Sequence, residues 1–221
     1  MNGIVSIHLR QSTAHAVVAE RGTVLVDAGP AGSTRTLLRR LGRVGVDPDG
    51  ISLIVLTHCH PDHAGGAAEL SRQLRAPVAV HAAEVDWATT GTSRLYEPQR
   101  LFGRILRRTL NPAFPAFTPD LVLEDGAALD TYGPPLTVLH TPGHTPGSVT
   151  LLHRPDGSAL LGDLLAGGML RRDRPGMPFL AQDAGQVTAS VRAVLEHGPN
   201  RLLFGHGRPA SAASARRLAR R

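Results

Sequence analysis

One stretch of the sequence decides the fold of this chain: His58-Cys59-His60-Pro61-Asp62-His63. Its imidazoles and its carboxylate are groups that bind Zn, Fe and Mn in proteins. The apolar residues 51–57 before it have the pattern of a buried strand, and residues 64–74 after it have the pattern of a helix. On an extended backbone His58 and His60 can point the same way, because they lie two positions apart. The stretch therefore predicts a metal site at the carboxyl end of a strand.

Three further strand ends each carry one ligand-type residue. They are His144 after residues 136–140, Asp163 after residues 158–161 and His206 after residues 201–204. Each of the three follows a glycine, which lets the backbone approach a metal closely or bend sharply. Taken alone, Asp62 could be only a helix N-cap. The clustering of Asp62 with histidines and the repeated pattern at other strand ends favour a site for two metal ions instead.

With these motifs in this order, the chain resembles the metallo-β-lactamase-fold metallohydrolases, in their glyoxalase II-like and lactonase-like branch. The resemblance covers nearly the whole chain. It rests on Val26-Asp27-Ala28-Gly29, on residues 58–63, and on His144, Asp163 and His206. It implies an α/β fold of one domain, residues 1–221, built as a four-layer αββα sandwich with two metal ions at one edge of the paired sheets.

The resemblance also implies how the ligands are divided between two divalent metal ions, with Zn favoured and Fe or Mn as alternatives. The first ion takes His58, His60 and His144, and the second takes Asp62, His63 and His206. Asp163 bridges the two ions, and Asp27 steadies the ligand loop from behind. The alternative for Asp27 is a turn that has no link to the metals.

The chemistry implied is hydrolysis by a hydroxide that bridges the metals and attacks an ester, thioester or lactone carbonyl. Metal binding lowers the pKa of water from about 15.7 towards about 7. Asp163 acts through the metals, and Asp62 is the candidate to carry a proton to the leaving group. The β-lactamases of this fold are a poorer match, because they carry Cys or Ser where Asp163 stands. Many of them also use a Lys, which this sequence does not contain.

Several features leave the substrate open. The glutathione-binding extension of glyoxalase II-type thioesterases is missing after His206, and the Tyr that lactonases carry after the bridging Asp is missing from residues 164–168. A mono-iron oxygenase acting on a persulfide is one alternative, which metal count and identity would distinguish. A phosphodiesterase or nuclease of the same fold is another. A non-catalytic binding module is least favoured, because every ligand residue is kept.

The gap between His63 and His144 holds a segment at about residues 89–120 that alternates basic, aromatic and proline-rich stretches. We expect it to be a lid-like insertion, with a helix at residues 99–110. Together with residues 164–180 it is expected to form an apolar substrate pocket, suited to an acyl chain or aromatic ester. The candidate pocket residues are Tyr96, Phe102, Phe114, Phe117, Met169 and Phe179. The alternative is ordinary packing of a surface insertion.

Composition bounds the remaining questions. The net charge is +6, but all 24 basic residues are Arg and only 4% of residues are aromatic, so a nucleic-acid partner is not expected. The single cysteine, Cys59, excludes an internal disulfide framework, and we expect its thiol to be buried. No apolar run is long enough to span a bilayer and no secretion signal is visible. The sequence thus predicts a cytoplasmic enzyme with a small-molecule substrate, and it leaves the oligomeric state open.

Periodicity predicts the remaining elements, and six other histidines are expected to be structural. The predicted strands are residues 4–9, 14–19, 23–26, 121–123, 136–140, 149–153, 159–161 and 202–204, and the predicted helices are residues 34–44, 186–196 and 210–218. The structural histidines are His8, His15, His81, His140, His153 and His197.

Overall fold

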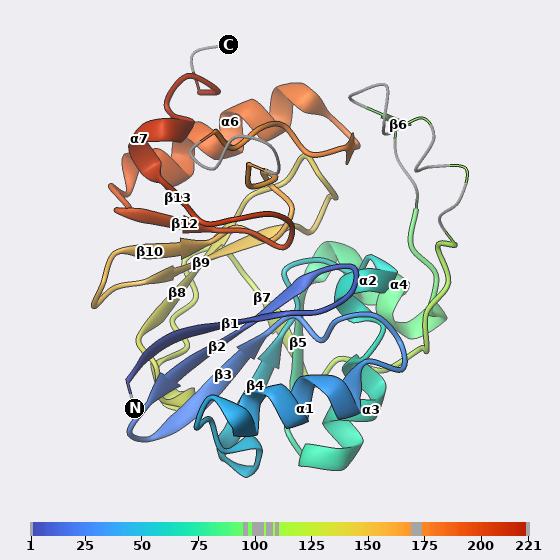
Figure 1. Ribbon diagram of the computed structural model, residues 1–221. Coiled ribbons are helices and arrows are strands. Elements are labelled where there is room, and N and C mark those ends of the chain that lie inside the picture. The colour runs from blue at the N-terminus through green and yellow to red at the C-terminus, as the bar shows by residue number, and fades with distance from the viewer. Residues whose placement is uncertain are drawn as a thin grey trace.

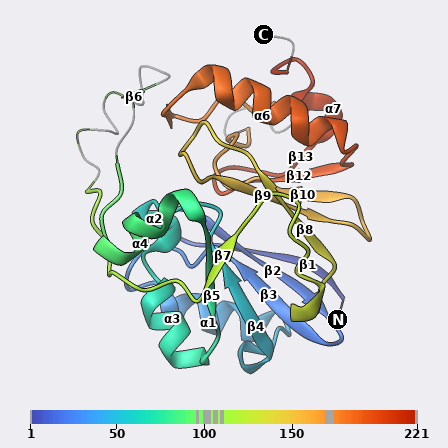
Figure 2. The same cartoon turned by 180° about the vertical axis from the view of Figure 1, so that it is seen from behind.

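Two β-sheets pack face to face, and helices cover the outer face of each (Figures 1 and 2). The computed structural model describes residues 2–94, 97–98, 104, 108, 111–168 and 174–219. Its layers confirm the αββα sandwich predicted from the sequence. No helix among these residues is long and apolar enough to cross a membrane.

The first sheet is built by the N-terminal half of the chain. Its strands are β1 (Gly3–His8), β2 (Thr13–Ala19), β3 (Gly22–Val26), β4 (Ile51–Val55), β5 (Val78–His81) and β7 (Leu121–Leu123), paired in that order. Strands β1 to β3 are antiparallel, and β3, β4, β5 and β7 are parallel. The outer face is covered by α1 (Thr34–Arg43) and α3 (Ala67–Leu74). Short helices link these elements: η1 (Pro48–Gly50), α2 (Pro61–Ala64), η2 (Ala82–Glu84), α4 (Val85–Thr90) and η3 (Asp130–Tyr132).

The second sheet is built by the C-terminal half. Its order is β13-β12-β10-β9-β8, from β8 (Leu136–His140), β9 (Val149–His153), β10 (Ser158–Leu160), β12 (Arg201–Leu203) and β13 (Ala210–Ser211). Of the strand pairs described in this sheet, β10–β12 is parallel and the others are antiparallel. Its outer face is covered by α6 (Ala184–Glu196) and α7 (Ala212–Ala215).

Strand β4 shows why a mostly apolar run forms a strand here. Leu53 and Val55 belong to the core between the two sheets, whereas Ile51 and Ile54 belong to the core under the helices of the first sheet. A strand that is covered on both faces favours apolar side chains. The polar residue of β4, Ser52, is half-buried, and its hydroxyl lies within hydrogen-bonding distance of the carbonyls of Thr23 and Tyr132. Each fully buried Leu, Ile or Val side chain contributes roughly 1.5–3 kcal/mol to stability. The ligand loop therefore starts from a rigid strand end.

The predicted helix at residues 64–74 is in fact two helices, α2 and α3, separated by Gly65 and Gly66. A Cβ at Gly65 would collide with the backbone of Pro61 and Ala31. A Cβ at Gly66 would collide with the carbonyl oxygen of Ala28. The break therefore lets the loop after β3 pack directly on the helix that carries His63. The spacing of apolar residues does not predict this break, because it depends on a contact with a distant segment.

The end of the chain also differs from the prediction of one helix over residues 210–218. Ala210 and Ser211 form β13, which pairs with β12, and α7 begins only after Ser211, whose side chain accepts a hydrogen bond from the Ser214 amide. Strand β5 was missing from the prediction altogether. Pairing with a neighbouring strand made these segments extended, and no short-range pattern signals it.

The ends of the predicted insertion at residues 89–120 are anchored to each other. The amide of Phe114 donates to the carbonyl of Gly91, and Thr92 and Ala113 form a β-bridge. Further out, β6 (Glu97–Pro98) pairs with β11 (Leu180–Ala181). The predicted helix at residues 99–110 falls outside the described residues, apart from Arg104 and Arg108.

Candidate metal centre

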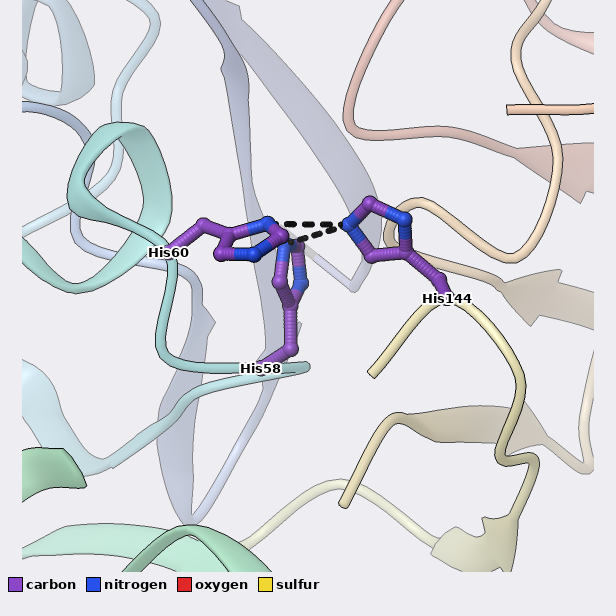
Figure 3. A group of neighbouring side chains, drawn as sticks. All are labelled: His58, His60 and His144. Atoms are coloured by element: carbon purple, nitrogen blue, oxygen red, sulfur yellow. Dashed lines mark hydrogen bonds between the residues drawn. The ribbon is translucent and has the colours of Figure 1, made fainter. Parts of the chain in front are cut away.

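Three histidine side chains from the two halves of the chain point toward one another (Figure 3). His58 and His60 lie in the loop between β4 and α2, and His144 lies in the loop between β8 and β9. The Nε2 atom of His144 is 3.2 Å from Nε2 of His58 and 3.0 Å from Nδ1 of His60. All three rings are buried. We call these residues the three-histidine group.

In two of these rings, one nitrogen donates to a backbone carbonyl, and this determines that the other nitrogen, which faces the neighbouring histidines, carries a lone pair. Nδ1 of His144 donates to the Leu180 carbonyl at 2.8 Å, and Nε2 of His60 donates to the Arg94 carbonyl at 3.1 Å. Because a carbonyl only accepts, the inner nitrogens of these neutral rings are unprotonated. Two lone pairs 3.0 Å apart repel unless a cation lies between them. Ligand nitrogens around tetrahedral Zn are about 3.3 Å apart, so the group fits such an ion.

The pKa values agree with neutral imidazoles in this group. Burial, together with the neighbouring His144, lowers the pKa of His60 to about 3. Burial and the surrounding imidazoles hold the pKa of His58 well below its usual range. Neutral imidazole is the form that ligates metal ions.

A second group, Asp62, His63 and His206, lies beside the first. Nε2 of His206 is 3.1 Å from Oδ2 of Asp62 and 3.4 Å from Nε2 of His63. Burial raises the pKa of Asp62, but His63 and His206 outweigh it and lower that pKa to about 2. Burial acts to lower the pKa of His206, but Asp163 and Asp62 outweigh it and raise that pKa to about 10. The one carboxylate of this group, Asp62, is therefore ionised at neutral pH, and its negative charge attracts a cation.

Asp163 lies between the two groups. Its Oδ1 is 3.4 Å from Nε2 of His63, and its Oδ2 is 3.2 Å from Nε2 of His206 and 3.7 Å from Nε2 of His144. Oδ1 is buried and has no hydrogen-bond partner among the residues that the structure describes. An unsatisfied buried carboxylate oxygen is costly unless a cation compensates it. The donor set thus fits two cations that share one carboxylate.

Asp27 supports the second group from behind. Its Oδ2 accepts a hydrogen bond from Nδ1 of His63 at 2.8 Å, which turns Nε2 of the same ring toward Asp163. Its Oδ1 accepts from the Thr57 amide at 2.8 Å. Asp27 has a φ of 66°, a left-handed conformation that costs about 1 kcal/mol or more in a residue with a side chain. One carboxylate thus orients a candidate ligand and the start of the ligand loop.

Residues 8–206 match one protein family, the metallo-beta-lactamase superfamily. The chain belongs to this superfamily. It is a metal-dependent hydrolase, as predicted from the sequence.

Three similar proteins show the range of this superfamily. The hydroxyacylglutathione hydrolase GloC of Haemophilus influenzae is 28% identical, over 71% of this chain and 68% of that protein. The acyl-coenzyme A thioesterase MBLAC2 of Homo sapiens is 35% identical, over 53% of this chain and 43% of that protein. The crystal structure of the B3 metallo-beta-lactamase BLEG-1 has a TM-score of 0.72 and 25% identity, and the match covers 96% of this chain and 95% of that one.

Two residues that contact the loop carrying His58 and His60 were not predicted from the sequence. Glu84 is a buried carboxylate that accepts hydrogen bonds from the Cys59 amide and from the Gly147 amide. Trp87, the single tryptophan, stacks on His60 with ring centroids 6.3 Å apart and planes 15° apart. Both stand in a segment, residues 82–90, whose pattern contains no ligand motif. Only the fold brings that segment to the ligand loops.

Three of the six predicted pocket residues lie in the described part of the chain. Phe114 is only 8% exposed and belongs to the core of the first sheet. Phe117 packs against that core, and its ring centroid lies 6.4 Å from that of Phe114. Phe179 is half-buried next to β11. Tyr96, Phe102 and Met169 lie outside the described residues. Substrate contact by these residues stays a prediction.

Histidines outside the two groups make structural contacts. Nε2 of His140 donates to the Pro146 carbonyl at 2.8 Å, and its ring stacks on His81 with centroids 3.9 Å apart. His15 lies within hydrogen-bonding distance of Ser6 and of the Phe204 carbonyl. The Cys59 side chain is fully buried in the core, and burial raises the pKa of its thiol well above the usual range.

Proposed function

We propose that this protein is a dinuclear metal-dependent hydrolase acting on an acyl compound, with thioesters favoured over esters and lactones. The observation that carries the proposal is the position of Asp163, whose carboxylate oxygens lie within 3.7 Å of ligand-type nitrogens in both groups. A shared carboxylate between two donor groups is the arrangement that holds two cations close together.

The ligand sets in this proposal are the three-histidine group for one ion, and Asp62, His63 and His206 for the other, with Asp163 common to both. Zn suits imidazole and carboxylate donors, and Fe or Mn would also be accepted. When bound, two such ions supply a hydroxide nucleophile near neutral pH and polarise the carbonyl oxygen under attack. A cytoplasmic location and a small-molecule substrate belong to the same proposal.

The side chains of the centre then have distinct tasks. Asp163 fixes the distance between the two ligand groups. Asp27 keeps the proton of His63 on Nδ1, so that Nε2 stays free to ligate. Asp62, whose pKa is lowered to about 2 by His63 and His206 against the effect of burial, is ionised at neutral pH. Its carboxylate can accept the proton that the attacking oxygen loses once the carbon–oxygen bond has formed, and can pass that proton to the leaving group.

Leaving-group chemistry supports a thioester substrate. An alkoxide leaves poorly unless it receives a proton at that moment, so an ester or a lactone would depend fully on the proton that Asp62 takes up and passes on. A thiolate leaves readily, because thiols have a pKa of about 8.5. The names of two similar proteins, a thioesterase and a hydroxyacylglutathione hydrolase, point to the same bond.

The test is a substrate panel on protein whose metal content has been measured. Thioesters, oxygen esters, lactones, a β-lactam and a phosphodiester are offered to protein loaded with Zn, Mn or Fe. Two ions per chain and fastest turnover of a thioester are expected. One iron per chain with oxygen uptake on a persulfide would replace the hydrolase with an oxygenase, and preference for the phosphodiester would replace it with a nuclease-type activity.

A further inference from the structure

Glu84 is a buried carboxylate that the proposed reaction does not use. It is the last residue of η2 and is only 1% exposed. Both of its carboxylate oxygens accept hydrogen bonds. Oε2 accepts from the Cys59 amide, and Oε1 accepts from the Thr145 hydroxyl and from the Gly147 amide, the last at 3.1 Å. A buried charge needs such partners, so this position of the side chain is strongly determined.

The donors around Glu84 belong to both loops of the three-histidine group. Cys59 stands between His58 and His60, and Thr145 follows His144 directly. The first loop leaves the first sheet after β4, and the second joins β8 to β9 in the second sheet. One carboxylate therefore links the two halves of the sandwich at the place where their histidines meet.

The second loop packs closely against Glu84 at Gly147. A Cβ at Gly147 would lie 2.6 Å from Cγ of Glu84, closer than real Cβ atoms come to other atoms. The Thr145 hydroxyl that donates to Glu84 is itself 2.7 Å from Oγ of Ser148, and both residues are buried. Position 147 therefore requires a glycine so that the second loop can close onto the carboxylate.

We propose that Glu84 is a positioning residue that sets the separation between His144 and the His58–His60 pair, and thereby the metal affinity of the three-histidine group. The inference rests on the proposed function, because it requires that this group binds a metal ion. The main support of the second group is Asp27, which accepts a hydrogen bond from His63. Asp27 also accepts from the Thr57 amide at the start of the loop that carries His58 and His60, so Glu84 is the carboxylate that contacts both loops of the three-histidine group and Asp27 contacts only the first of them.

The test compares Glu84→Gln with Asp27→Asn in the full chain, using Zn²⁺ and Co²⁺ as the probes. Zn²⁺ affinity is measured by competition with a chelating dye, and Co²⁺ binding is followed by quenching of Trp87, which stacks on His60 and is the only tryptophan. Glu84→Gln is expected to weaken the binding step that quenches Trp87 by about 10- to 100-fold, the usual effect of losing a group that orients a ligand. Asp27→Asn should weaken the other step more strongly than this one, because its direct contact with a ligand is the hydrogen bond from His63.

The control is Glu69→Gln, the same chemical change at an exposed position of α3. It should leave both binding steps unchanged. Wild-type affinity in Glu84→Gln, with two ions still bound, would overturn the positioning role and leave the proposed function standing. Equal weakening of both steps would also overturn it, because Glu84 would then support the whole fold. A wild-type protein that binds no metal would overturn the proposed function itself.

If Glu84→Gln does not fold, Gly147→Ala tests the same contact from the other loop. The added methyl group pushes against Cγ of Glu84, while the carboxylate and the histidines all remain. Selective weakening of the step that quenches Trp87 is again expected. Unchanged affinity for both ions in Gly147→Ala would contradict the proposal.

Discussion

Gly205 lies so close to Asp163 that a side chain at position 205 would displace the carboxylate: an added Cβ would come closer than 3.0 Å to Oδ1 of Asp163 and to the His63 ring. The glycine is therefore part of the metal centre, although it has no side chain to offer. It allows the strand end that leads to His206 to pass directly behind Asp163. Its backbone also joins the halves of the chain, because its carbonyl accepts the Thr13 amide.

Gly205→Ala is expected to lower bound metal from two ions to one or none, while the circular dichroism spectrum stays that of the folded protein. The methyl group must move Asp163 or His63, and both belong to the proposed ligand sets. Elemental analysis measures the outcome. Gly42→Ala in α1 is the matched control, because a Cβ there meets nothing within 4 Å. Full metal loading in Gly205→Ala would contradict this account of the close approach.

Asp163→Asn is expected to reduce turnover by about 10²- to 10³-fold, which is the effect of losing one well-placed electrostatic contact in an active site. The amide keeps the shape of the side chain but cannot share a negative charge between two cations. Folded yield and melting temperature of the metal-free protein should stay close to those of the wild type. Near-normal turnover with two bound ions would show that Asp163 does not bridge the ligand groups.

The buried His15 should make the protein less stable in acid. Burial lowers the pKa of His15 from 6.5 to about 4, although Asp27 acts to raise it. Between those values the unfolded chain binds a proton that the folded chain does not. The stability contributed by neutral His15 is therefore complete above pH 6.5 and is lost as the pH falls towards 4, by about 3 kcal/mol in total.

Denaturant unfolding of metal-loaded protein at several pH values between 4 and 7 measures this effect. His15→Gln removes the titrating group and keeps a polar side chain near Ser6 and the Phe204 carbonyl. The free energy of unfolding of the variant should fall less steeply with acid than that of the wild type. Parallel curves for the two proteins would assign the acid sensitivity to other groups.

Phe114→Ala tests packing against substrate contact. Because Phe114 is buried in the core of the first sheet, its removal should lower the free energy of unfolding by about 3–5 kcal/mol. Phe117→Ala is the companion variant, since Phe117 only packs against that core. The acyl-chain preference of the Phe114→Ala enzyme, measured with a series of acyl thioesters, should stay that of the wild type. A changed preference with little loss of stability would instead show that Phe114 contacts the substrate.

The sequence alone was enough to predict most of the strands and to name the ligand-type residues, because both depend on local patterns. The order of those residues carried the family resemblance that implied the fold. Apolar runs such as residues 136–140 and 149–153 became strands with the predicted bounds. The density of ligand types at residues 58–63 pointed to a metal site before any contact was known. In each case the information lies within a few neighbouring positions, where periodicity and residue chemistry act directly.

What only the tertiary structure decided lies in contacts between distant segments. Glu84 meets Cys59 and Thr145 across 25 and 61 positions, and no local pattern marks a carboxylate as buried between two loops. The same holds for Gly65 and Gly66, which divide a predicted helix because the loop after β3 packs on it, and for β13, which exists only through its pairing with β12. Side-chain chemistry can be recognised along the chain. Burial and partnership arise only when the two sheets close on each other, because they depend on the distance in space between segments that the chain itself keeps far apart.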